Sequence, residues 1–347
     1  MTFETVLTAF AAFILTLVLT GVVRRLAVSH GVLDVPNDRS SHSMPTPRGG
    51  GVAIVFVSIA ASVALAWRGV LDVNLFLALT GGGVAVAAVG FVDDRRQVPA
   101  SIRLAAHLGA AFWALLCLGG LPPLRWAQHV VSFGWMGYVV GALGIGWTLN
   151  LFNFMDGIDG IAASEAAFIA GGGAFLAFAA GLSGAVPAMG LAFGAVCCGF
   201  LVWNWPPAKI FMGDVGSGYM GYVIVVLAIA AGRDNPVALL VWLILGGVFF
   251  SDATLTLMRR LARGERVYEA HRTHAYQWLA QRWGSHRAVT LAVLFVNLGW
   301  LLPCAWLATH YPARAPWMVM LALAPLVLLA IIAGAGRQMA CVPRDVS

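Results

Sequence analysis

The chain has 347 residues and a formal net charge of +6, with 60% hydrophobic and only 10% charged residues. A soluble domain is closer to a quarter charged, so this composition excludes an ordinary soluble globular protein. The positive charge does not indicate nucleic-acid binding, because no basic tail or basic-aromatic module carries it. The 5 cysteines lie mostly in apolar segments and do not predict a disulfide framework.

Apolar stretches recur along the whole chain. A run of about 18 or more uncharged apolar residues predicts a transmembrane helix, because backbone groups in hydrocarbon must be satisfied within the segment. The uncharged segment 166–208 must form two helices, with Gly181, Gly184 and Pro187 at the turn. We expect an all-α polytopic membrane helix bundle of about eleven transmembrane helices. The spans lie at roughly 3–23, 49–67, 73–92, 103–121, 133–152, 161–180, 185–203, 216–232, 236–258, 287–308 and 315–336.

The positions of Lys and Arg predict the orientation of the chain. Cytoplasmic loops of membrane proteins are enriched in these residues. With the N-terminus outside, most of the 21 Lys and Arg residues fall in inside loops or at the C-terminus. We therefore expect the N-terminus outside, the C-terminus in the cytoplasm, and one integral membrane domain over residues 1–347. Its cytoplasmic loops lie at about 24–48, 92–102, 150–160, 204–217 and 259–286.

The polar, motif-like segments all fall on this predicted inside face. The first loop carries Arg39 and Arg48, beside a glycine run at 49–51 whose N–H groups could approach an anion. The third span ends in Asp93 and Asp94, which suit a metal site or a general base near the lipid headgroups, or form a solvated helix end.

The segment Asn150-x-x-Asn153-x-x-Asp156-x-x-Asp159 repeats a polar residue every third position. This spacing predicts that all four side chains share one face of a helix end. The alternative is a simple N-cap for the next helix, but a cap explains at most one aspartate.

The last two polar segments lie around Asp214 and His271. Phe211-Met-Gly-Asp214-Val-Gly-Ser offers a carboxylate ligand for Mg²⁺, or it forms an ordinary turn. His271, Arg272 and His274 suit phosphate oxygens, with zinc binding or a solvated basic loop as alternatives. Asp252 falls near the inside end of the ninth span, where snorkelling or pairing with Arg259 is expected.

In this order, the motifs from about Asp34 to Gln277 resemble those of the polyprenyl-phosphate N-acetylhexosamine-1-phosphate transferases (glycosyltransferase family 4), which include the phospho-N-acetylmuramoyl-pentapeptide transferase. The segments at 150–160 and 211–217 are the most specific, and the segment at 271–277 looks like the O-antigen-initiating branch. The chain departs from the peptidoglycan enzymes at Gln97, where they carry a lysine.

The resemblance implies a role for each matching residue. It makes Asp93, Asp94 and Asp156 catalytic, with the aspartate pair near the lipid phosphate, and it makes Asp214 and Asp156 metal ligands. It implies that substrates are bound by Asn153, Asp159, Phe211, Arg39, Arg48, His271, Arg272 and His274, of which Asp159 and Phe211 hold the uracil.

The resemblance also implies a reaction. A sugar-1-phosphate of the N-acetylhexosamine type would pass from a UDP-sugar to undecaprenyl phosphate, which releases UMP and forms undecaprenyl-diphospho-sugar. This is the first step of O-antigen or other cell-surface polysaccharide synthesis. The expected cofactor is Mg²⁺, with Mn²⁺ as the alternative ion, and the expected partners are the two substrates and membrane lipids.

The expected location is the bacterial cytoplasmic (inner) membrane, with the active site facing the cytoplasm, and a homodimer is left open. A membrane transporter of nucleotide-sugars or other organic anions is the alternative from a different class. A transporter needs polar groups near the bilayer midplane and a path to the outside. This sequence places its polar motifs at one face.

Overall fold

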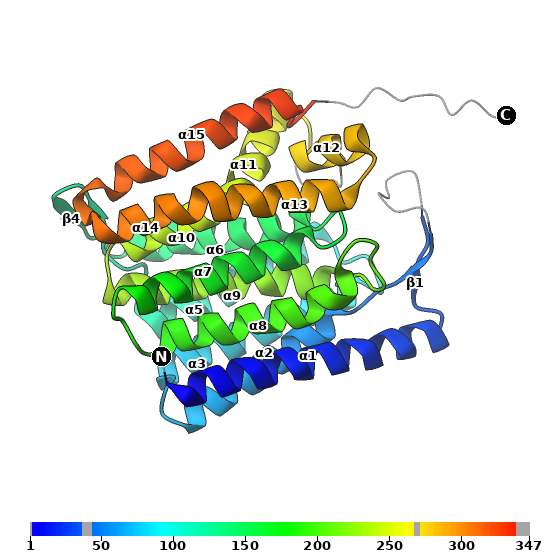
Figure 1. Ribbon diagram of the computed structural model, residues 1–347, viewed down its shortest axis with the longest axis horizontal. Helices are drawn as coiled ribbons and strands as arrows, with labels where there is room; N and C mark the ends of the chain where they lie inside the picture. The colour runs from blue at the N-terminus through cyan, green and yellow to red at the C-terminus, as the bar shows by residue number, and fades with distance from the viewer. Residues whose placement is uncertain (1, 37–43, 267–270, 338–347) are drawn as a thin grey trace.

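The computed structural model describes residues 2–36, 44–266 and 271–337, and these residues are mostly helical (Figure 1). The long helices run side by side, with a short β-hairpin at each end of the bundle (Figure 1). One hairpin pairs β1 (Leu33–Asp34) with β2 (Thr46–Pro47), and the other pairs β3 (Leu124–Trp126) with β4 (His129–Val131).

The helices coincide with the predicted spans to within a few residues. Several predicted spans consist of consecutive helical segments. Two of these spans contain a π-helical turn, labelled η1 and η2. In chain order the helices are α1 (Phe3–Ser29), α2 (Gly51–Trp67), α3 (Val73–Leu77), η1 (Ala78–Gly82), α4 (Gly83–Asp93), α5 (Ala100–Leu118), α6 (Met136–Met155), α7 (Ile161–Ala179), α8 (Ala185–Asn204), α9 (Asp214–Asp234), α10 (Ala238–Leu245), α11 (Gly247–Ala262), α12 (Ala275–Trp283), α13 (His286–Val296), η2 (Asn297–Leu301), α14 (Leu302–His310), η3 (Pro312–Arg314) and α15 (Ala315–Ala333).

These lengths confirm the predicted all-α polytopic membrane fold. Within the described residues, nine helices are long and apolar enough to cross a membrane, and the bent pair α10–α11 makes up to ten. The apolar helix α2 is shorter, at 17 residues. The number of eleven crossings and the sides on which the termini lie stay predictions.

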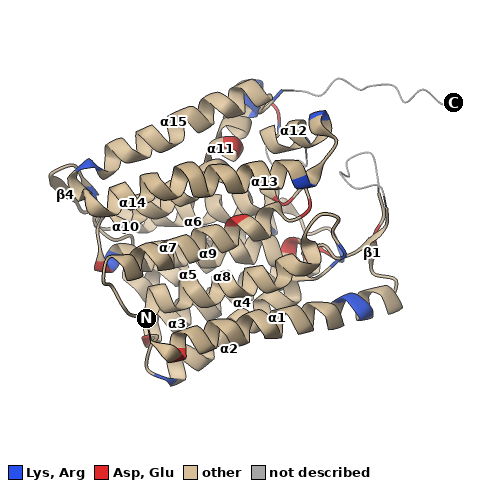
Figure 2. Ribbon diagram, viewed as in Figure 1, with Lys and Arg blue, Asp and Glu red and all other residues tan. Residues whose placement is uncertain are grey.

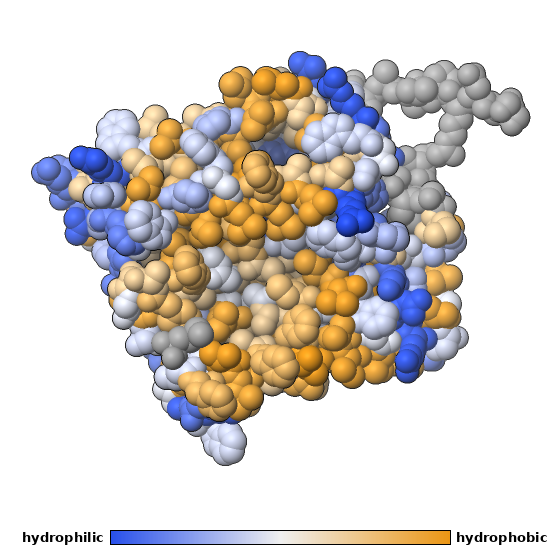
Figure 3. Space-filling model, viewed as in Figure 1, coloured by the Kyte–Doolittle hydropathy of each residue, from blue (hydrophilic) through white to orange (hydrophobic). Residues whose placement is uncertain are grey.

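The surface divides into an apolar middle and polar ends. Figure 3 shows hydrophobic side chains across the middle of one face, with hydrophilic residues toward both ends. Large apolar side chains such as Phe10, Leu15 and Leu328 are exposed on the long helices. Figure 2 shows Lys and Arg near the ends of the helices. Lipid tails can cover such a band, because the helices satisfy their backbone groups internally.

The bundle is built around α9. This helix contacts α2, α4, α6, α7, α8 and α10, and almost all of its residues are buried. Glycines allow the closest approaches: a Cβ on Gly221 would lie 2.6 Å from the Thr148 carbonyl oxygen of α6. Because α9 begins at Asp214, its neighbours are arranged around the residue that the sequence marks as a metal ligand.

The ninth predicted span is not one straight helix. The chain bends by 75° between α10 and α11. Gly246 and Gly247 occupy the bend, and a Cβ on Gly247 would lie 2.8 Å from Leu323 of α15. Sharp kinks commonly occur at glycine, which favours the helical conformation less than other residues. The bend directs α11 away from the bundle axis (Figure 1).

We expect Gly221→Leu to destabilise the protein, because its side chain would push α6 away from α9. Overpacking of this kind costs about 1–3 kcal/mol or more. Gly144→Leu on α6 is the matched control, since a Cβ at Gly144 meets nothing within 4 Å. Thermal unfolding in detergent should show a lower midpoint only for the Gly221 variant. Equal midpoints for the two variants would contradict the close packing.

Candidate active site

Asp94 joins the end of α4 to the start of α9. Its carboxylate accepts hydrogen bonds from the backbone N–H groups of Asp214, at 2.8 Å, and Val215, at 3.2 Å. A carboxylate is stabilised at a helix N-terminus, where N–H groups lack partners and the helix dipole is positive. Gly213 has φ +76°, and a Cβ there would overlap the Asp94 carboxylate. The glycine therefore leaves room for this cap.

Arg48 lies between two of the predicted carboxylates. Its Nη2 atom is 2.7 Å from Asp94 Oδ1 and 3.3 Å from Asp214 Oδ1. The backbone holds this position, because the Phe211 N–H donates to the Pro47 carbonyl at 2.8 Å. Burial opposes the charged form of Arg48, but Asp94 and then Asp214 outweigh it and raise its pKa. Arg48 thus neutralises part of a concentrated negative charge.

The glycines after Arg48 have a different role from the expected one. The N–H groups of Gly49 and Gly50 donate to the Phe211 carbonyl oxygen, and that of Gly51 donates to the Met212 carbonyl oxygen. The expectation that these groups approach an anion is wrong, because the chain itself uses them. They fasten the start of α2 to the segment before α9.

Asp93 is fastened to the start of α5. Its Oδ1 atom accepts the Val98 N–H at 2.7 Å, and its Oδ2 atom lies 2.6 Å from Arg103 Nη1. The Asp93 side chain is buried, with 8% of its surface exposed. Sequence reasoning missed Arg103, although its place on the helix after the aspartate pair is a signal that could have identified it.

The end of α6 corrects one expectation. The helix ends at Met155, so Asn150 and Asn153 lie on it, but Asp156 is its C-cap and Asp159 lies in the loop before α7. The prediction that all four share one helix face is therefore wrong. Burial, and next the nearby Asp214 carboxylate, raise the pKa of Asp156 well above its ordinary value. Asp156 thus belongs to the same electrostatic cluster as Asp214.

One cavity opens beside this cluster, with a volume of about 370 Å³. Its wall combines apolar residues, several of them from α4 and α5, with polar ones. The polar residues include Asp93, Asp214, Arg103, His107, Asn150 and Asn153. The structure therefore brings the predicted Asn153 together with one residue of the aspartate pair and with Asp214.

A second cavity, of about 440 Å³, contains Asp159 and Phe211 in its wall. The structure thus brings together the two residues that the resemblance assigns to the uracil. Asp159 Oδ2 accepts the Ala208 N–H at 3.0 Å, and Oδ1 lies 3.3 Å from His286 Nδ1. His286, at the start of α13, is a cavity residue that sequence reasoning missed.

Asn204 supports both motif loops from the last position of α8. Its side chain is buried, accepts the Gly160 N–H at 3.0 Å and donates to the Ile210 carbonyl at 3.0 Å. Sequence reasoning missed this residue, because an asparagine at a helix end also fits a solvated turn. Its bonds hold the loop after Asp159 against the loop before Phe211.

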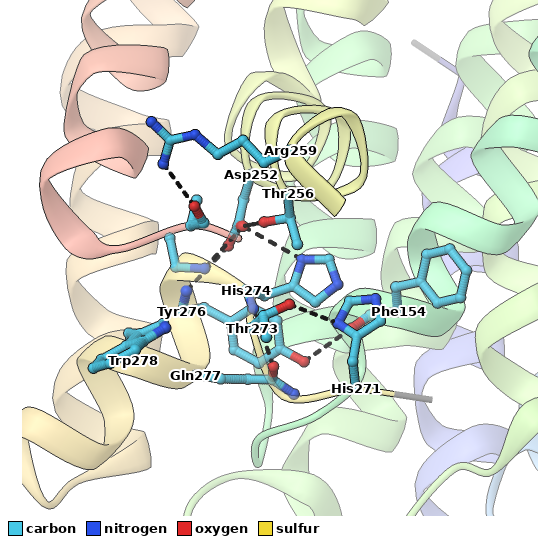
Figure 4. Close-up of polar contacts among 12 residues, drawn as sticks. Phe154, Asp252, Thr256, Arg259, His271, Thr273, His274, Tyr276, Gln277 and Trp278 are labelled. Atoms are coloured by element: carbon cyan, nitrogen blue, oxygen red, sulfur yellow. Dashed lines mark hydrogen bonds and ion pairs between the residues drawn. The ribbon is translucent and has the colours of Figure 1, made fainter. Parts of the chain in front are cut away.

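The histidine loop lies beside the end of α6. The rings of His271 and His274 stack with centroids 4.9 Å apart, and Phe154 lies 6.3 Å from His274 (Figure 4). The predicted pairing of Asp252 with Arg259 is wrong. Asp252 contacts His274, whereas Arg259 donates to the Ala335 carbonyl oxygen (Figure 4).

Two predicted substrate-binding residues, Arg39 and Arg272, are not among those placed above. Arg39 lies outside the described residues. Arg272 lies in the described histidine loop, where it has a partner.

The carboxylate oxygens of this site suit a hard cation that keeps most of its bound water molecules. In the described part of the chain, no three His, Cys, Asp or Glu side chains form a metal cage. Mg²⁺ usually binds through one or two carboxylates, together with waters and substrate phosphates. Asp214 and Asp156 fit that pattern, since each is close to further negative charge. A zinc site at His271 and His274 has no third ligand among the described residues.

Comparisons with known proteins agree with these motifs. The model of glycosyl transferase family 4 matches residues 76–232. A probable undecaprenyl-phosphate N-acetylglucosaminyl 1-phosphate transferase of Bacillus subtilis is 30% identical, over 84% of this chain and 82% of the relative. A decaprenyl-phosphate N-acetylglucosaminephosphotransferase of Mycobacterium tuberculosis is 31% identical, over 84% and 79%. A phospho-N-acetylmuramoyl-pentapeptide-transferase of Halalkalibacterium halodurans is 27% identical, over 84% and 95%.

We expect Asn204→Ala to lower stability by about 1–3 kcal/mol, because it leaves the buried Gly160 N–H and Ile210 carbonyl without partners. Asn74→Ala, an exposed asparagine on α3, is the control for removal of the same side chain. Thermal unfolding of the two variants in detergent checks the difference. A Gly160 loop that is held independently of Asn204 would leave both midpoints at the wild-type value.

Proposed function

The chain belongs to glycosyl transferase family 4, and we propose that it transfers an N-acetylhexosamine-1-phosphate from a UDP-sugar to undecaprenyl phosphate. UMP is released and undecaprenyl-diphospho-sugar is formed. The names of the relatives in Bacillus and Mycobacterium favour N-acetylglucosamine as the first sugar to test. The product would start an O-antigen or another cell-surface polysaccharide.

One observation carries this proposal: the short segment from Phe211 to Asp214 contributes a wall residue to each of the two cavities. Phe211 lines the cavity that contains Asp159, and Asp214 lines the cavity that contains Asp93 and Arg103. We infer that a donor held in one cavity and an acceptor held in the other direct their phosphates toward this segment and its carboxylate cluster. Phosphoryl transfer depends mainly on such positioning and on neutralising charge.

The cavity of Asp93 fits the lipid substrate. Its walls combine apolar residues of α4 and α5, such as Val86 and Leu104, with the polar end at Asp93 and Arg103. An isoprenoid chain can lie against the apolar wall, and its phosphate would meet the Arg103 guanidinium. Arg103 thus supplies a cation close to Asp93, in a region where Gln97 replaces the lysine of the peptidoglycan enzymes.

The cavity of Asp159 fits the nucleotide. Phe211 and Asp159 share its wall: an aromatic residue can contact the plane of a base, and an aspartate can distinguish a base by its N–H groups. The His286 contact and the Ala208 N–H orient the Asp159 carboxylate before a ligand arrives. Such preorganisation lowers the cost of ordering on binding.

Mg²⁺ fits the cluster at Asp214 and Asp156, with Mn²⁺ as an alternative. When bound, the ion would neutralise the charge of the transferred phosphate. Arg48 already stands between Asp94 and Asp214, which indicates that this point requires positive charge. The carboxylates that converge here would otherwise repel one another.

In the proposed reaction, an oxygen of the lipid phosphate attacks the phosphorus that carries the sugar. The new P–O bond forms as the bond from that phosphorus to the UMP oxygen breaks. One phosphoanhydride replaces another, so the reaction is expected to be reversible. Asp93 lines the lipid cavity and would face the acceptor phosphate, whereas Asp94 holds the start of α9 and orients Arg48.

The proposed site faces the cytoplasm in a bacterial inner membrane. The supporting observation is that Arg48 and Arg103 lie against the aspartate pair, since cytoplasmic segments of membrane proteins are enriched in basic residues. UDP-sugars are cytoplasmic metabolites, so a site on this side would meet its donor directly.

We expect the purified protein to release UMP from UDP-N-acetylglucosamine only when undecaprenyl phosphate and Mg²⁺ are present. A panel of other UDP-N-acetylhexosamines identifies the preferred sugar. Uptake of intact UDP-sugar into vesicles without UMP release would instead support the transporter alternative and refute the transferase. Asp214→Asn and Asp94→Asn should each lower kcat by about 100-fold or more.

Asp72→Asn is the matched control for these two substitutions. Asp72 caps α3 through the N–H groups of Asn74 and Leu75, so the same chemical change is made far from the proposed site. Its turnover should stay within about threefold of wild type. Size-exclusion profiles show whether each variant remains folded. Normal turnover in Asp214→Asn would mean that the assigned metal ligand is wrong.

We expect Arg48→Gln to bind Mn²⁺ more tightly in the absence of substrates, by about tenfold. The guanidinium lies 2.7 Å from Asp94 and 3.3 Å from Asp214, so it competes with a cation for the same oxygens. Arg96→Gln removes the same charge from an exposed position and should leave the affinity near wild type. Electron paramagnetic resonance of free Mn²⁺ measures both affinities. Unchanged binding in Arg48→Gln would contradict the competition.

A further inference from the structure

Asp252 is a buried carboxylate whose hydrogen-bond partners come from its own helix and from the segment that begins α12 (Figure 4). It lies on α11, with 6% of its side chain exposed. The backbone N–H groups of Ala275 and Tyr276 donate to it at 2.9 and 3.0 Å, and the Thr256 hydroxyl donates at 3.0 Å. The fourth contact is with His274, whose Nδ1 atom lies 3.3 Å from Oδ1.

These donors determine which form Asp252 takes and which ring nitrogen of His274 faces it. A carboxylate surrounded by donors is stabilised in its ionised form, in which it can only accept hydrogen bonds. We therefore expect the Nδ1 atom of His274, which lies 3.3 Å from this carboxylate, to carry a hydrogen and donate it to Asp252. The other ring nitrogen, Nε2, is then the one that remains for another partner.

Nε2 of His274 is buried but has no hydrogen-bond partner among the described residues. His274 is only 1% exposed, so this atom does not rely on bulk water. Nε2 of His271, in the ring stacked on His274, is also without a partner in that part of the chain. Buried polar nitrogens of this kind are costly unless a ligand or ordered water satisfies them.

Phe154 connects the two rings to the proposed lipid cavity. Phe154 stands beside both of them, with centroids 6.1 Å from His271 and 6.3 Å from His274, and Phe154 also lines that cavity. The Tyr276 hydroxyl donates to the Phe154 carbonyl at 2.9 Å, which fastens the start of α12 to the end of α6. The histidine loop is thus held against the helix that carries Asn153.

The start of α12 is not itself an open phosphate site. Asp252 already takes the N–H groups of Ala275 and Tyr276, which are the first two of this helix. The carboxylate also balances the positive end of the helix dipole. A substrate phosphate in this region would therefore contact side chains, and His274 is the one that Asp252 orients.

We propose that Asp252 is a positioning residue of the transfer reaction: it holds His274 with Nδ1 protonated, so that Nε2 is presented to a substrate phosphate. This inference rests on the proposed function. The contact with Asp252 fixes the orientation of the ring, so that Nε2 is the ring atom left to contact a phosphate group. Asp252 acts through His274 and does not touch substrate.

Nuclear magnetic resonance of the protein labelled with ¹⁵N-histidine tests the orientation without any substrate. The signals of His274 are identified by their loss in His274→Gln. We expect Nδ1 of His274 to carry a proton in the wild type, and we expect Asp252→Asn to release this preference. A wild-type His274 with a bare Nδ1 would overturn the inference, whether or not the protein is active.

A double-mutant cycle on UMP release tests the function of the contact. Asp252→Asn should lower kcat/KM by about 10- to 100-fold, as loss of a carboxylate that orients a histidine does elsewhere. The double variant with His274→Ala should lose no more than about threefold beyond His274→Ala alone, because both changes remove the same interaction. Losses that multiply would show that Asp252 acts independently of His274 and would overturn the inference.

Gln277→Ala separates positioning from simple anchoring of α12. Gln277 Oε1 accepts the His274 N–H at 3.2 Å, so its loss loosens the same helix start without removing the ring contact. This variant should lose thermal stability but keep the His274 tautomer. Asp234→Asn, at the far end of α9, should match wild type in every assay.

The outcomes distinguish this inference from the proposed function. A wild type that shows the Nδ1–H tautomer but no UMP release refutes both the transferase and the reaction role of Asp252. A wild type that turns over but gives an additive cycle refutes the inference alone.

Discussion

The whole site depends on one interaction, the capping of α9 by Asp94. This carboxylate stands at the end of α4, 120 residues before the N–H groups that it accepts. Because α9 is the central helix of the bundle, the contact ties the most buried element to the aspartate pair. It also places Asp214 beside Arg48, so the geometry of the carboxylate cluster follows from a helix cap that the fold supplies.

The same arrangement occurs a second time at α12. Asp252 on α11 takes the first N–H groups of that helix, as Asp94 does for α9. In both places the carboxylate comes from another helix, and a residue suited to phosphate chemistry stands next to it: Arg48 in one case and His274 in the other. A helix start whose N–H groups bond to a protein carboxylate does not bind the substrate itself, so the neighbouring Arg48 or His274 side chain is the group that remains for this contact.

Much of the fold could be predicted from the sequence, because hydrocarbon imposes a simple length rule on apolar segments. The bounds of α7 and α8 follow from one uncharged run with glycines and a proline at its middle. The bend at Gly246 could not be predicted in this way, since hydropathy is continuous across it. Gly247 packs closely against α15 at this bend, and such a tertiary contact leaves no signal in hydropathy.

For the site, too, the sequence predicted the residue types but not their contacts. Residue types identified the carboxylates, because adjacent acidic and amide groups at the end of an apolar span need a reason to be there. Partners could not be assigned, since Arg48, Arg103 and His274 each meet a carboxylate from another part of the chain or from the next helix. The error at Asp252 illustrates why. Sequence spacing favoured Arg259 on the same helix, but two backbone N–H groups from α12 offered this buried carboxylate a better set of donors. A buried charge takes the partners that satisfy most of its hydrogen-bonding capacity, and the fold alone determines which ones come within reach.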